Sequence, residues 1–384
     1  MTIPSQFDKI RPFEPEELPG VYNRLLDNPQ FKAVLTYLFP QVPFAQLAEK
    51  IRACHTSLDF QKHFSYVFLQ GLMAKMSTGL DMDASAIDNT QRYTFVSNHR
   101  DIVLDSALLS KLLLDAGFTT TCEIAIGDNL LSLPWVKDLA RLNKAFIVER
   151  SVGMREMLIS SKRLSEYMHF AIAQKHENIW IAQREGRAKD SDDHTQTAVL
   201  KMMAMGGEGN PAERLVQLHI VPLAISYEYD PCDYLKAREL QQRRDTTHFQ
   251  KGPMEDVDSM RTGIMGYKGR VHYHCAPCID AYLESLDPDM PKNLFFDEVA
   301  AHIDSEIHRN YRLYANNYIA ADLLENSSRF AGKYTAEDKK QFENYLHTQL
   351  EKIELPNKDT AFLTNKLLTM YANPLFNQLK ALGQ

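Results

Sequence analysis

The sequence predicts an α/β protein with a mixed, mostly parallel sheet flanked by helices, an N-terminal helical domain and a helical C-terminal extension. In the middle of the chain, short β-rich runs alternate with amphipathic helical segments, which is typical of a sheet that helices cover on both faces. On either side of this region the apolar residues recur at helical spacing. These patterns predict a helical domain at residues 1–90, an α/β core at residues 91–285 and a helical extension at residues 286–384.

The N-terminal region is predicted to be helical because its apolar residues lie three and four positions apart. The segments VYNRLLD, FKAVLTYLF and FQKHFSYVFLQGLMAKM carry this spacing, with turn signals at Asn28-Pro29 and at Pro40. The segment MSTGLDMDASAIDNTQ is polar, contains Gly79 and has few large apolar residues. We interpret it as the boundary between the first two domains.

Six β-rich runs define the expected sheet of the core: YTFVS, CEIAIG, AFIVER, NIWIAQ, HIVPLAISY and RVHYHCA. Helical patterns such as SALLSKLLLDAG and REMLISSKRLSEYMHFAIAQ lie between several of them. In sheets of this kind ligands bind at the carboxyl ends of the strands, so the loops that follow the strands are the expected place for chemistry. The helical tail after residue 286 carries no chemical motif, and we interpret it as a packing or partner surface.

Composition and charge narrow the class of partner. A net charge of -7 argues against nucleic acid, although a local basic patch could still bind a phosphorylated substrate. The basic run LKARELQQRR at residues 235–244 is interpreted as a solvated helix face, with anionic lipid or an acidic acyl carrier protein as the alternative partner. The first residues lack a signal-peptide pattern, no apolar run approaches about 18 residues, and five cysteines suit a reducing compartment. We expect a cytoplasmic protein whose membrane contact, if any, is peripheral.

The segment FVSNHRDIVLDSALLS carries the first candidate catalytic residue. A strand is expected to end near Ser97, His99 lies in the loop, and a helix follows, whose first backbone N–H groups could hold a developing oxyanion. Imidazole titrates near neutral pH and suits removal of a proton from an alcohol, and a carboxylate on its other nitrogen would fix the tautomer. Asp101 and Asp105 both compete for that place. Six residues of regular helix turn by about 600°, so Asp105 faces His99 only if His99 lies outside the helix.

Three further segments follow in order: GDNLLSLPWVKDLARLNKAFIVERS, IAQREGRAKD and IVPLAISYEY. Together with NHRDIVLD they resemble the four-block pattern of the glycerolipid acyltransferases, a superfamily that includes glycerol-3-phosphate and lysophosphatidate acyltransferases. The resemblance covers roughly residues 93–230. It implies transfer of a fatty acyl group from acyl-CoA or acyl carrier protein to the hydroxyl of glycerol-3-phosphate or lysophosphatidate, in phospholipid synthesis, without a metal or other cofactor.

The resemblance also implies roles for particular residues. His99 matches the catalytic histidine and Asp105 its partner aspartate, but five residues separate them here where the family has four, so Asp101 remains a competitor. The third block has no residue between Gly186 and Arg187, and Arg187 and Lys189 therefore compete for one arginine's role. Planar guanidinium groups suit the acceptor's phosphate, whereas the alternative is surface ion pairing. The implied substrate-binding residues are Gly127, Asn129, Arg150, Glu185, Gly186, Arg187 and Lys189.

Two alternatives and one competing motif complete the interpretation. The acceptor could be an amino-acid lipid, or the chain could be a non-catalytic lipid-binding protein with a degenerate site. Cys275 and Cys278 form a CxxC that follows His272 and His274, and such residues can bind zinc or form a redox pair. No second suitably spaced pair follows them, so we expect no metal site in this motif.

Overall fold

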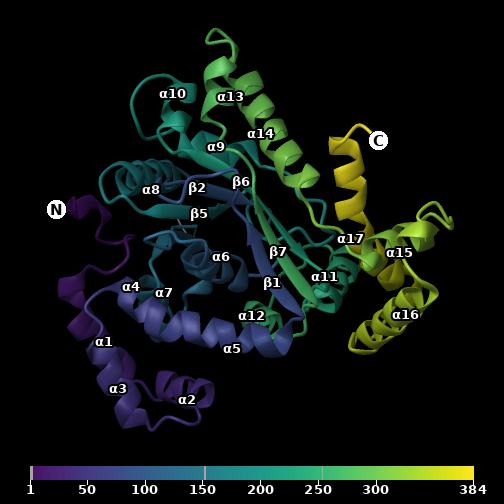
Figure 1. Ribbon diagram of the computed structural model, residues 1–384, viewed down its shortest axis with the longest axis horizontal. Helices are drawn as coiled ribbons and strands as arrows, with labels where there is room; N and C mark the ends of the chain where they lie inside the picture. Colours follow the sequence, from purple (N-terminus) through teal and green to yellow (C-terminus); the bar gives the residue numbers. More distant parts are fainter. Residues whose placement is uncertain (1–2, 151–152, 253) are drawn as a thin grey trace.

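A seven-stranded sheet lies at the centre of the computed structural model, which describes residues 3–150, 153–252 and 254–384 (Figure 1). The strand order is β1-β7-β6-β2-β5-β3-β4, in which only β6 and β7 pair antiparallel. The predicted mixed, mostly parallel sheet is confirmed. The strands are β1 (Gly79–Asp83), β2 (Thr94–Ser97), β3 (Cys122–Gly127), β4 (Ala145–Val148), β5 (Asn178–Ala182), β6 (Ile220–Tyr227) and β7 (Arg270–Cys275).

Helices precede, connect and follow these strands, as the alternating pattern predicted. Before the sheet lie α1 (Leu18–Asp27), α2 (Pro29–Leu38), α3 (Phe44–Arg52), α4 (Ser57–Phe60), a π-helical turn (Gln61–Ser65) and α5 (Tyr66–Met76). Among the strands lie α6 (Leu104–Asp115), α7 (Pro134–Leu142), α8 (Met154–Ala173), α9 (Thr197–Met203), α10 (Pro211–Val216), α11 (Asp233–Asp245) and α12 (Glu255–Met265). After β7 follow α13 (Asp280–Ser285), α14 (Lys292–Arg309), α15 (Ala315–Leu324), α16 (Ala336–Glu351) and α17 (Thr360–Ala381). Short 3-10 turns occupy Ser5–Phe7, Pro15–Glu17, Asp128–Leu130 and Ala331–Lys333.

Each face of the sheet has its own apolar core because successive side chains of a strand point to opposite faces. On β2, Phe95 packs with residues of α5 and α6, whereas Val96 packs with residues of α8, α9 and α14. Both side chains are fully buried. This two-sided burial explains why the core strands are almost continuously apolar rather than alternating.

The flanking helical regions are less separate than their sequence patterns suggested. Strand β1 lies inside the polar segment that we interpreted as a boundary, and it forms an edge strand beside β7. Helix α14 packs on the sheet through Phe295, Val299 and Ile303, whereas α15, α16 and α17 share another apolar cluster. None of the described helices has the length and apolar run needed to cross a membrane.

Candidate active site

His99 follows β2, the central strand, at the edge where the parallel strands β2 to β6 all end. The neighbouring Asn98 is fully buried and joins this loop to β6, because its Nδ2 donates to the Ile225 carbonyl at 2.9 Å and its Oδ1 accepts from the Ile225 N–H at 2.8 Å. The ring of Trp180 on β5 meets the His99 ring edge-on, with 5.7 Å between the centroids. The backbone of β6 and a side chain of β5 therefore hold the histidine loop in place.

Asp105 is the carboxylate that contacts His99. Its Oδ2 lies 2.8 Å from His99 Nδ1 and also accepts the backbone N–H groups of Arg100 at 2.6 Å and Asp101 at 3.0 Å. Helix α6 begins only at Leu104, so His99 lies outside the helix and Asp105, in its first turn, reaches back to it. The non-helical loop thus accommodates the one residue that this chain has in addition to the family's four between the histidine and the aspartate.

Asp101 begins the helix instead of orienting the histidine. Its Oδ1 accepts the N–H groups of Val103 and Leu104, each at 2.8 Å, which satisfies donors that a helix start leaves unpaired. Burial and the nearby Asp105 carboxylate raise the pKa of Asp101. Gly263 of α12 lies directly against this carboxylate, since a Cβ atom there would come within 1.9 Å of Asp101 Oδ2.

The expected oxyanion donors at this helix start are already in use. The N–H groups of Arg100 and Asp101 bind Asp105, and those of Val103 and Leu104 bind Asp101. That part of the sequence-based interpretation is therefore wrong for these four N–H groups. They order the loop around His99 rather than face a substrate.

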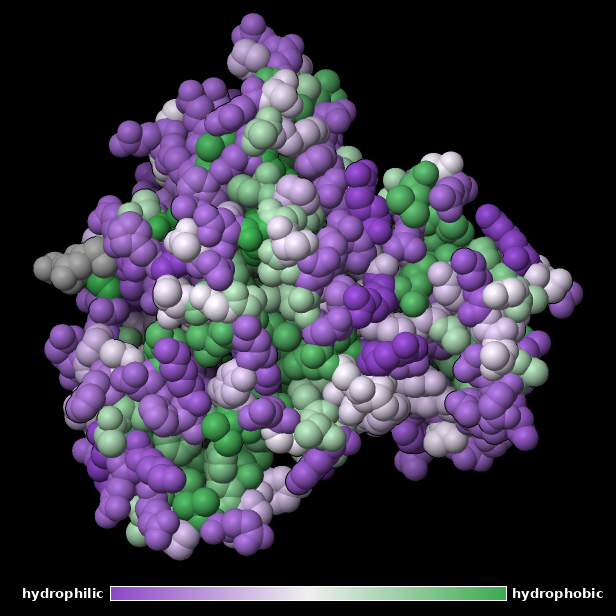
Figure 2. Space-filling model, viewed as in Figure 1, coloured by the Kyte–Doolittle hydropathy of each residue, from purple (hydrophilic) through white to green (hydrophobic). Residues whose placement is uncertain are grey.

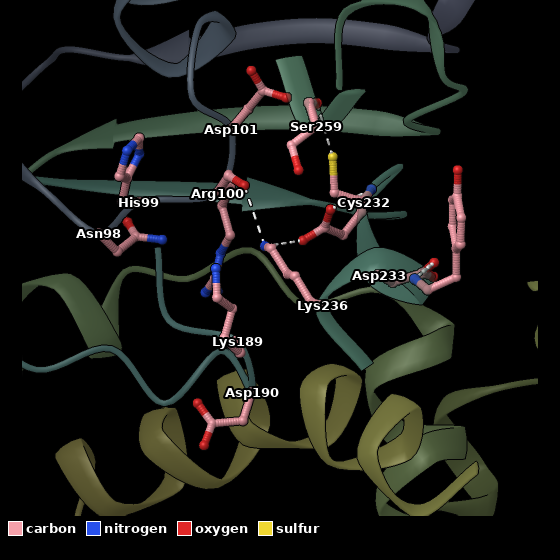
Figure 3. Close-up of polar contacts among 12 residues, drawn as sticks. Asn98, His99, Arg100, Asp101, Lys189, Asp190, Cys232, Asp233, Lys236 and Ser259 are labelled. Carbon is pink, nitrogen blue, oxygen red and sulfur yellow. Dashed lines mark hydrogen bonds and ion pairs between the residues drawn. The ribbon is translucent and has the colours of Figure 1, made fainter. Parts of the chain in front are cut away.

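Lys236 is a buried residue of the site that the sequence did not reveal. Its Nζ donates to the Arg100 carbonyl at 3.2 Å and forms an ion pair with Asp230 (Figure 3). The Arg100 guanidinium points elsewhere and pairs with buried Asp193 at 2.8 Å. Lys236 is only 1% exposed, so the interpretation of residues 235–244 as a solvated face is wrong at this position. A lysine in a basic run gives no sequence signal of burial, since lysine is rarely buried.

Four of the predicted substrate-binding residues form one group at the ends of β3, β4 and β5. A Cβ atom on Gly127 would lie 2.5 Å from Asn129 Oδ1 and 3.0 Å from Arg150 Nε, so all three residues are packed together. Arg150 Nη1 lies 3.3 Å from Glu185 Oε1, and the two side chains are 36% and 70% exposed. An exposed pair of this kind contributes little to stability, so Arg150 can exchange Glu185 for another anion.

Arg187 and Lys189 belong to a different group, beyond Gly186 on the loop after β5. They line a small basic cavity of about 10 Å³ together with residues of α11, α12 and the segment between them: Leu235, Lys236, Arg238, Glu239, Lys251, Glu255 and Ser259. Arg187 is 7% exposed, and its Nη1 has no hydrogen-bond partner among the described residues. Burial, reinforced by the charge of Arg187, lowers the pKa of Lys189 to about 8. Arg150 pairs with Glu185 and is not part of the wall of this cavity, so the two predicted arginines line different parts of the site.

A large apolar cavity of about 410 Å³ borders the other side of the histidine loop. Ile102, Val103 and Leu104, which follow His99 in the same loop, contribute to its wall. Side chains of α2, α5, α6, α7 and β3 supply most of the remaining wall, including Val34, Leu38, Phe68, Ala107, Ile124 and Leu139. Figure 2 shows apolar residues gathered around a hollow over α2 and α5. The N-terminal helices thus close the cavity from outside the sheet.

The CxxC motif does not form a single cluster with the two histidines before it. Cys275 is buried in the apolar core, whereas His272 Nδ1 lies 3.0 Å from Asp81 Oδ1 and His274 Nδ1 lies 3.6 Å from Asp83 Oδ2 on β1. Cys278 lies past the end of β7. The structure separates the four side chains that the sequence placed close together.

One comparison with known proteins agrees with the class that this site defines. A histidine–carboxylate pair beside an apolar cavity at the carboxyl edge of an α/β sheet is suited to an enzyme that activates a hydroxyl group for group transfer. Residues 82–226 match the family model described as acyltransferase. These residues therefore form an acyltransferase domain, as the four sequence blocks predicted, and the match supports acyl transfer as the activity.

Two other comparisons add no argument about function. No curated protein matches the chain. A solved 1-acyl-sn-glycerophosphate (LPA) acyltransferase from Thermotoga maritima is similar at 12% identity, over 76% of this chain and 93% of its own length, with a TM-score of 0.38. A similarity at this level supports no statement about substrates.

Proposed function

We propose that this acyltransferase moves a fatty acyl group from acyl-CoA or acyl carrier protein to the hydroxyl of glycerol-3-phosphate or lysophosphatidate, as a step of phospholipid synthesis. One observation supports the proposal above the others: the His99 loop lines an apolar cavity and is joined through Lys236 to a basic cavity. Ile102 to Leu104 line the apolar cavity, and Lys236, which lines the basic cavity, binds the Arg100 carbonyl. An acyl chain and a phosphate could therefore approach the same imidazole from two sides.

In this mechanism His99 is the general base. Nε2 removes the proton of the acceptor hydroxyl, while Asp105 holds Nδ1 and stabilises the imidazolium that forms. The oxygen attacks the thioester carbonyl, the carbon–sulfur bond breaks, and the departing thiolate takes the proton back from the imidazolium. The reaction proceeds without a metal, another cofactor or a covalent acyl-enzyme.

Arg187 and Lys189 are the proposed ligands of the acceptor's phosphate, with Arg150, Glu185 and the turn at Gly127 and Asn129 bordering the acceptor. Glu239 now provides the anion in the basic cavity, since its carboxylate lies 3.1 Å from Lys189 Nζ and 3.6 Å from Lys251 Nζ. A cavity of about 10 Å³ holds one water. The phosphate therefore has to displace Glu239 from the two lysines, and its charge of about −1.5 to −2 favours that exchange.

The apolar cavity is the proposed site of the acyl chain. Its volume of about 410 Å³ falls in the range of small-molecule pockets, and its wall is almost entirely apolar. Each methylene transferred from water to such a wall contributes about 0.8 kcal/mol, or roughly fourfold in affinity. Chain length should therefore be selected by how many methylenes the cavity accepts.

The exposed apolar residues near this cavity support a peripheral membrane contact for a cytoplasmic enzyme. Val34 and Tyr37 on α2 and Val67 on α5 are exposed large apolar side chains next to the cavity wall. An anionic membrane is the proposed surface, because it would present a lipid acceptor beside the cavity into which the acyl chain fits.

The acceptor assignment is tested with purified protein, labelled acyl-CoA and acyl-carrier-protein donors, and a panel of acceptors. We expect transfer to glycerol-3-phosphate or lysophosphatidate, and we expect Arg187→Met to raise the acceptor KM by about 10- to 100-fold, because a hydrogen bond to a charged group contributes about 1.5–3 kcal/mol. The donor KM should hardly change.

The matched control is Arg261→Met on α12, where the side chain is 76% exposed and outside both cavities. It should behave like the unchanged enzyme. Transfer to an amino-acid lipid in preference to the phosphorylated acceptors would contradict the acceptor assignment. Binding of acyl donors without transfer to any acceptor would favour the lipid-binding alternative.

Narrowing the apolar cavity should change chain-length preference. Ala107 on α6 lines the cavity, and Ala107→Phe adds a ring to the space proposed for the acyl chain. We expect kcat/KM to fall at least tenfold for long-chain donors and to change little for short-chain donors. Ala336→Phe, at an exposed position of α16, is the matched control. An equal loss for all chain lengths would show that the cavity does not select the chain.

A further inference from the structure

A second group of chemically reactive side chains lies at the edge of the sheet opposite His99. His219 immediately precedes β6, while Cys278 and Asp280 follow β7, which runs antiparallel to β6. The beginning of β6 and the end of β7 therefore meet at one place, far along both strands from the active-site edge. One nitrogen, one sulfur and one carboxylate oxygen of these residues all lie within 4.8 Å of one another.

Backbone hydrogen bonds join the two segments that carry these three side chains. The Ala276 N–H donates to the Pro222 carbonyl and the Ile279 N–H to the Ile220 carbonyl, each at 2.9 Å, so the two segments remain joined beyond the end of β7. Cys278 and Asp280 flank Ile279, and His219 flanks Ile220. The three side chains are thus presented by a paired scaffold rather than by two independent loops.

The side-chain geometry leaves coordinating capacity unused. His219 Nδ1 lies 2.6 Å from Asp280 Oδ2. Asp280 Oδ1 is enclosed and has no hydrogen-bond partner among the described residues. An enclosed carboxylate oxygen without a donor is costly, and a bound cation would satisfy it.

We propose that His219, Cys278 and Asp280 bind one divalent transition-metal ion of the zinc class, with water as a fourth ligand. Imidazole nitrogen, thiolate sulfur and carboxylate oxygen are the ligands that zinc takes in proteins, at about 2.0–2.3 Å. The thiolate disfavours calcium and magnesium, which prefer oxygen. The ion enters between His219 and Asp280 in place of their hydrogen bond. The proton on His219 Nδ1 leaves to solvent, with Nε2 remaining protonated, and the Cys278 thiol also loses its proton to solvent.

Such an ion would have a structural role, linking two strands, and would take no part in acyl transfer. It ties the start of β6, the strand that holds Asn98, to the segment after β7. Because a ligand that binds only the folded state stabilises it, thermal stability should rise with metal concentration.

The test uses tag-free, full-length protein stripped of metal and then exposed to Zn²⁺ or Co²⁺. We expect one ion per chain after gel filtration, a higher Tm with Zn²⁺, and a thiolate-to-cobalt absorption band with Co²⁺. Cys278→Ser should remove the band and the zinc-dependent rise in Tm, and His219→Gln should lose stoichiometric binding.

Two controls separate this site from other thiols and histidines. Cys54→Ser retains a hydroxyl for the hydrogen bond that Cys54 donates to the Lys50 carbonyl, and His272→Gln alters the histidine beside Asp81. Both should bind one ion. Substoichiometric metal in the unchanged protein, or a cobalt band that survives Cys278→Ser, would overturn the proposal. Acyl transfer by Cys278→Ser should persist, so failure here is distinct from failure of the proposed function.

Discussion

Replacing His99 with alanine should lower kcat for acyl transfer by about 10²- to 10⁴-fold, the usual contribution of a general base. The change removes the imidazole but leaves Asp105 bound to the N–H groups of Arg100 and Asp101. The loop should therefore remain ordered, and the free energy of unfolding should fall by only about 1 kcal/mol. Initial rates at saturating substrates and a thermal melt measure the two effects.

A second histidine provides the control for this experiment. His347 on α16 is 74% exposed, and its one ion pair among the described residues is with Glu351. His347→Ala should keep both rate and stability. Activity of His99→Ala within tenfold of the unchanged enzyme, in protein that melts normally, would contradict the assignment of His99 as the base.

Asp105→Asn should have the second large effect, on both rate and stability. The amide can still accept backbone N–H groups, but it carries no charge to stabilise the imidazolium, so we expect kcat to fall by about 10²-fold or more. The buried Oδ2 of Asp105 accepts hydrogen bonds from three partners. Because hydrogen bonds to a charged group contribute about 1.5–3 kcal/mol, we expect the free energy of unfolding to fall by about 2 kcal/mol. Kinetics and denaturant melts of the same preparation measure both.

Asp101→Asn is the decisive comparison, because the sequence alone made Asp101 a competitor. Asparagine is as good a helix cap as aspartate, so the bonds to the N–H groups of Val103 and Leu104 should survive. We expect rate and stability close to those of the unchanged enzyme. If Asp101→Asn lost activity and Asp105→Asn did not, the pairing of His99 with Asp105 would have no catalytic role.

The parts of the site that local sequence could predict are those set by strand and helix periodicity. The apolar run YTFVS predicted β2, and His99 was expected in the loop after it because chemistry in such sheets gathers at the carboxyl edge. Arg150 and Arg187 lie in the segments that follow β4 and β5, the kind of loop in which chemistry was expected. Their separation into two groups was not predictable, since it depends on which neighbours each loop meets.

The burial of charged residues could not be predicted from the sequence for the same reason. Lys236 and Arg187 look like ordinary members of basic runs, but α11 and α12 fold over the histidine loop and enclose them. The polar segment that forms β1 is a similar case. An edge strand depends on backbone hydrogen-bond partners more than on apolar side chains. For β1 these partners are supplied by β7.

The sequence by itself determined the α/β class, the order along the chain of six of the seven strands, the resemblance to acyltransferases and the position of His99, because each depends on short-range periodicity or on motif order. Only the tertiary structure decided that Asp105 rather than Asp101 meets the histidine, that the N-terminal helices close an apolar cavity beside it, and that His219 lies against Cys278 and Asp280. Each of these contacts joins elements through a loop conformation or a strand pairing. Their distances are set by packing across the whole sheet, which residue spacing along the chain does not encode.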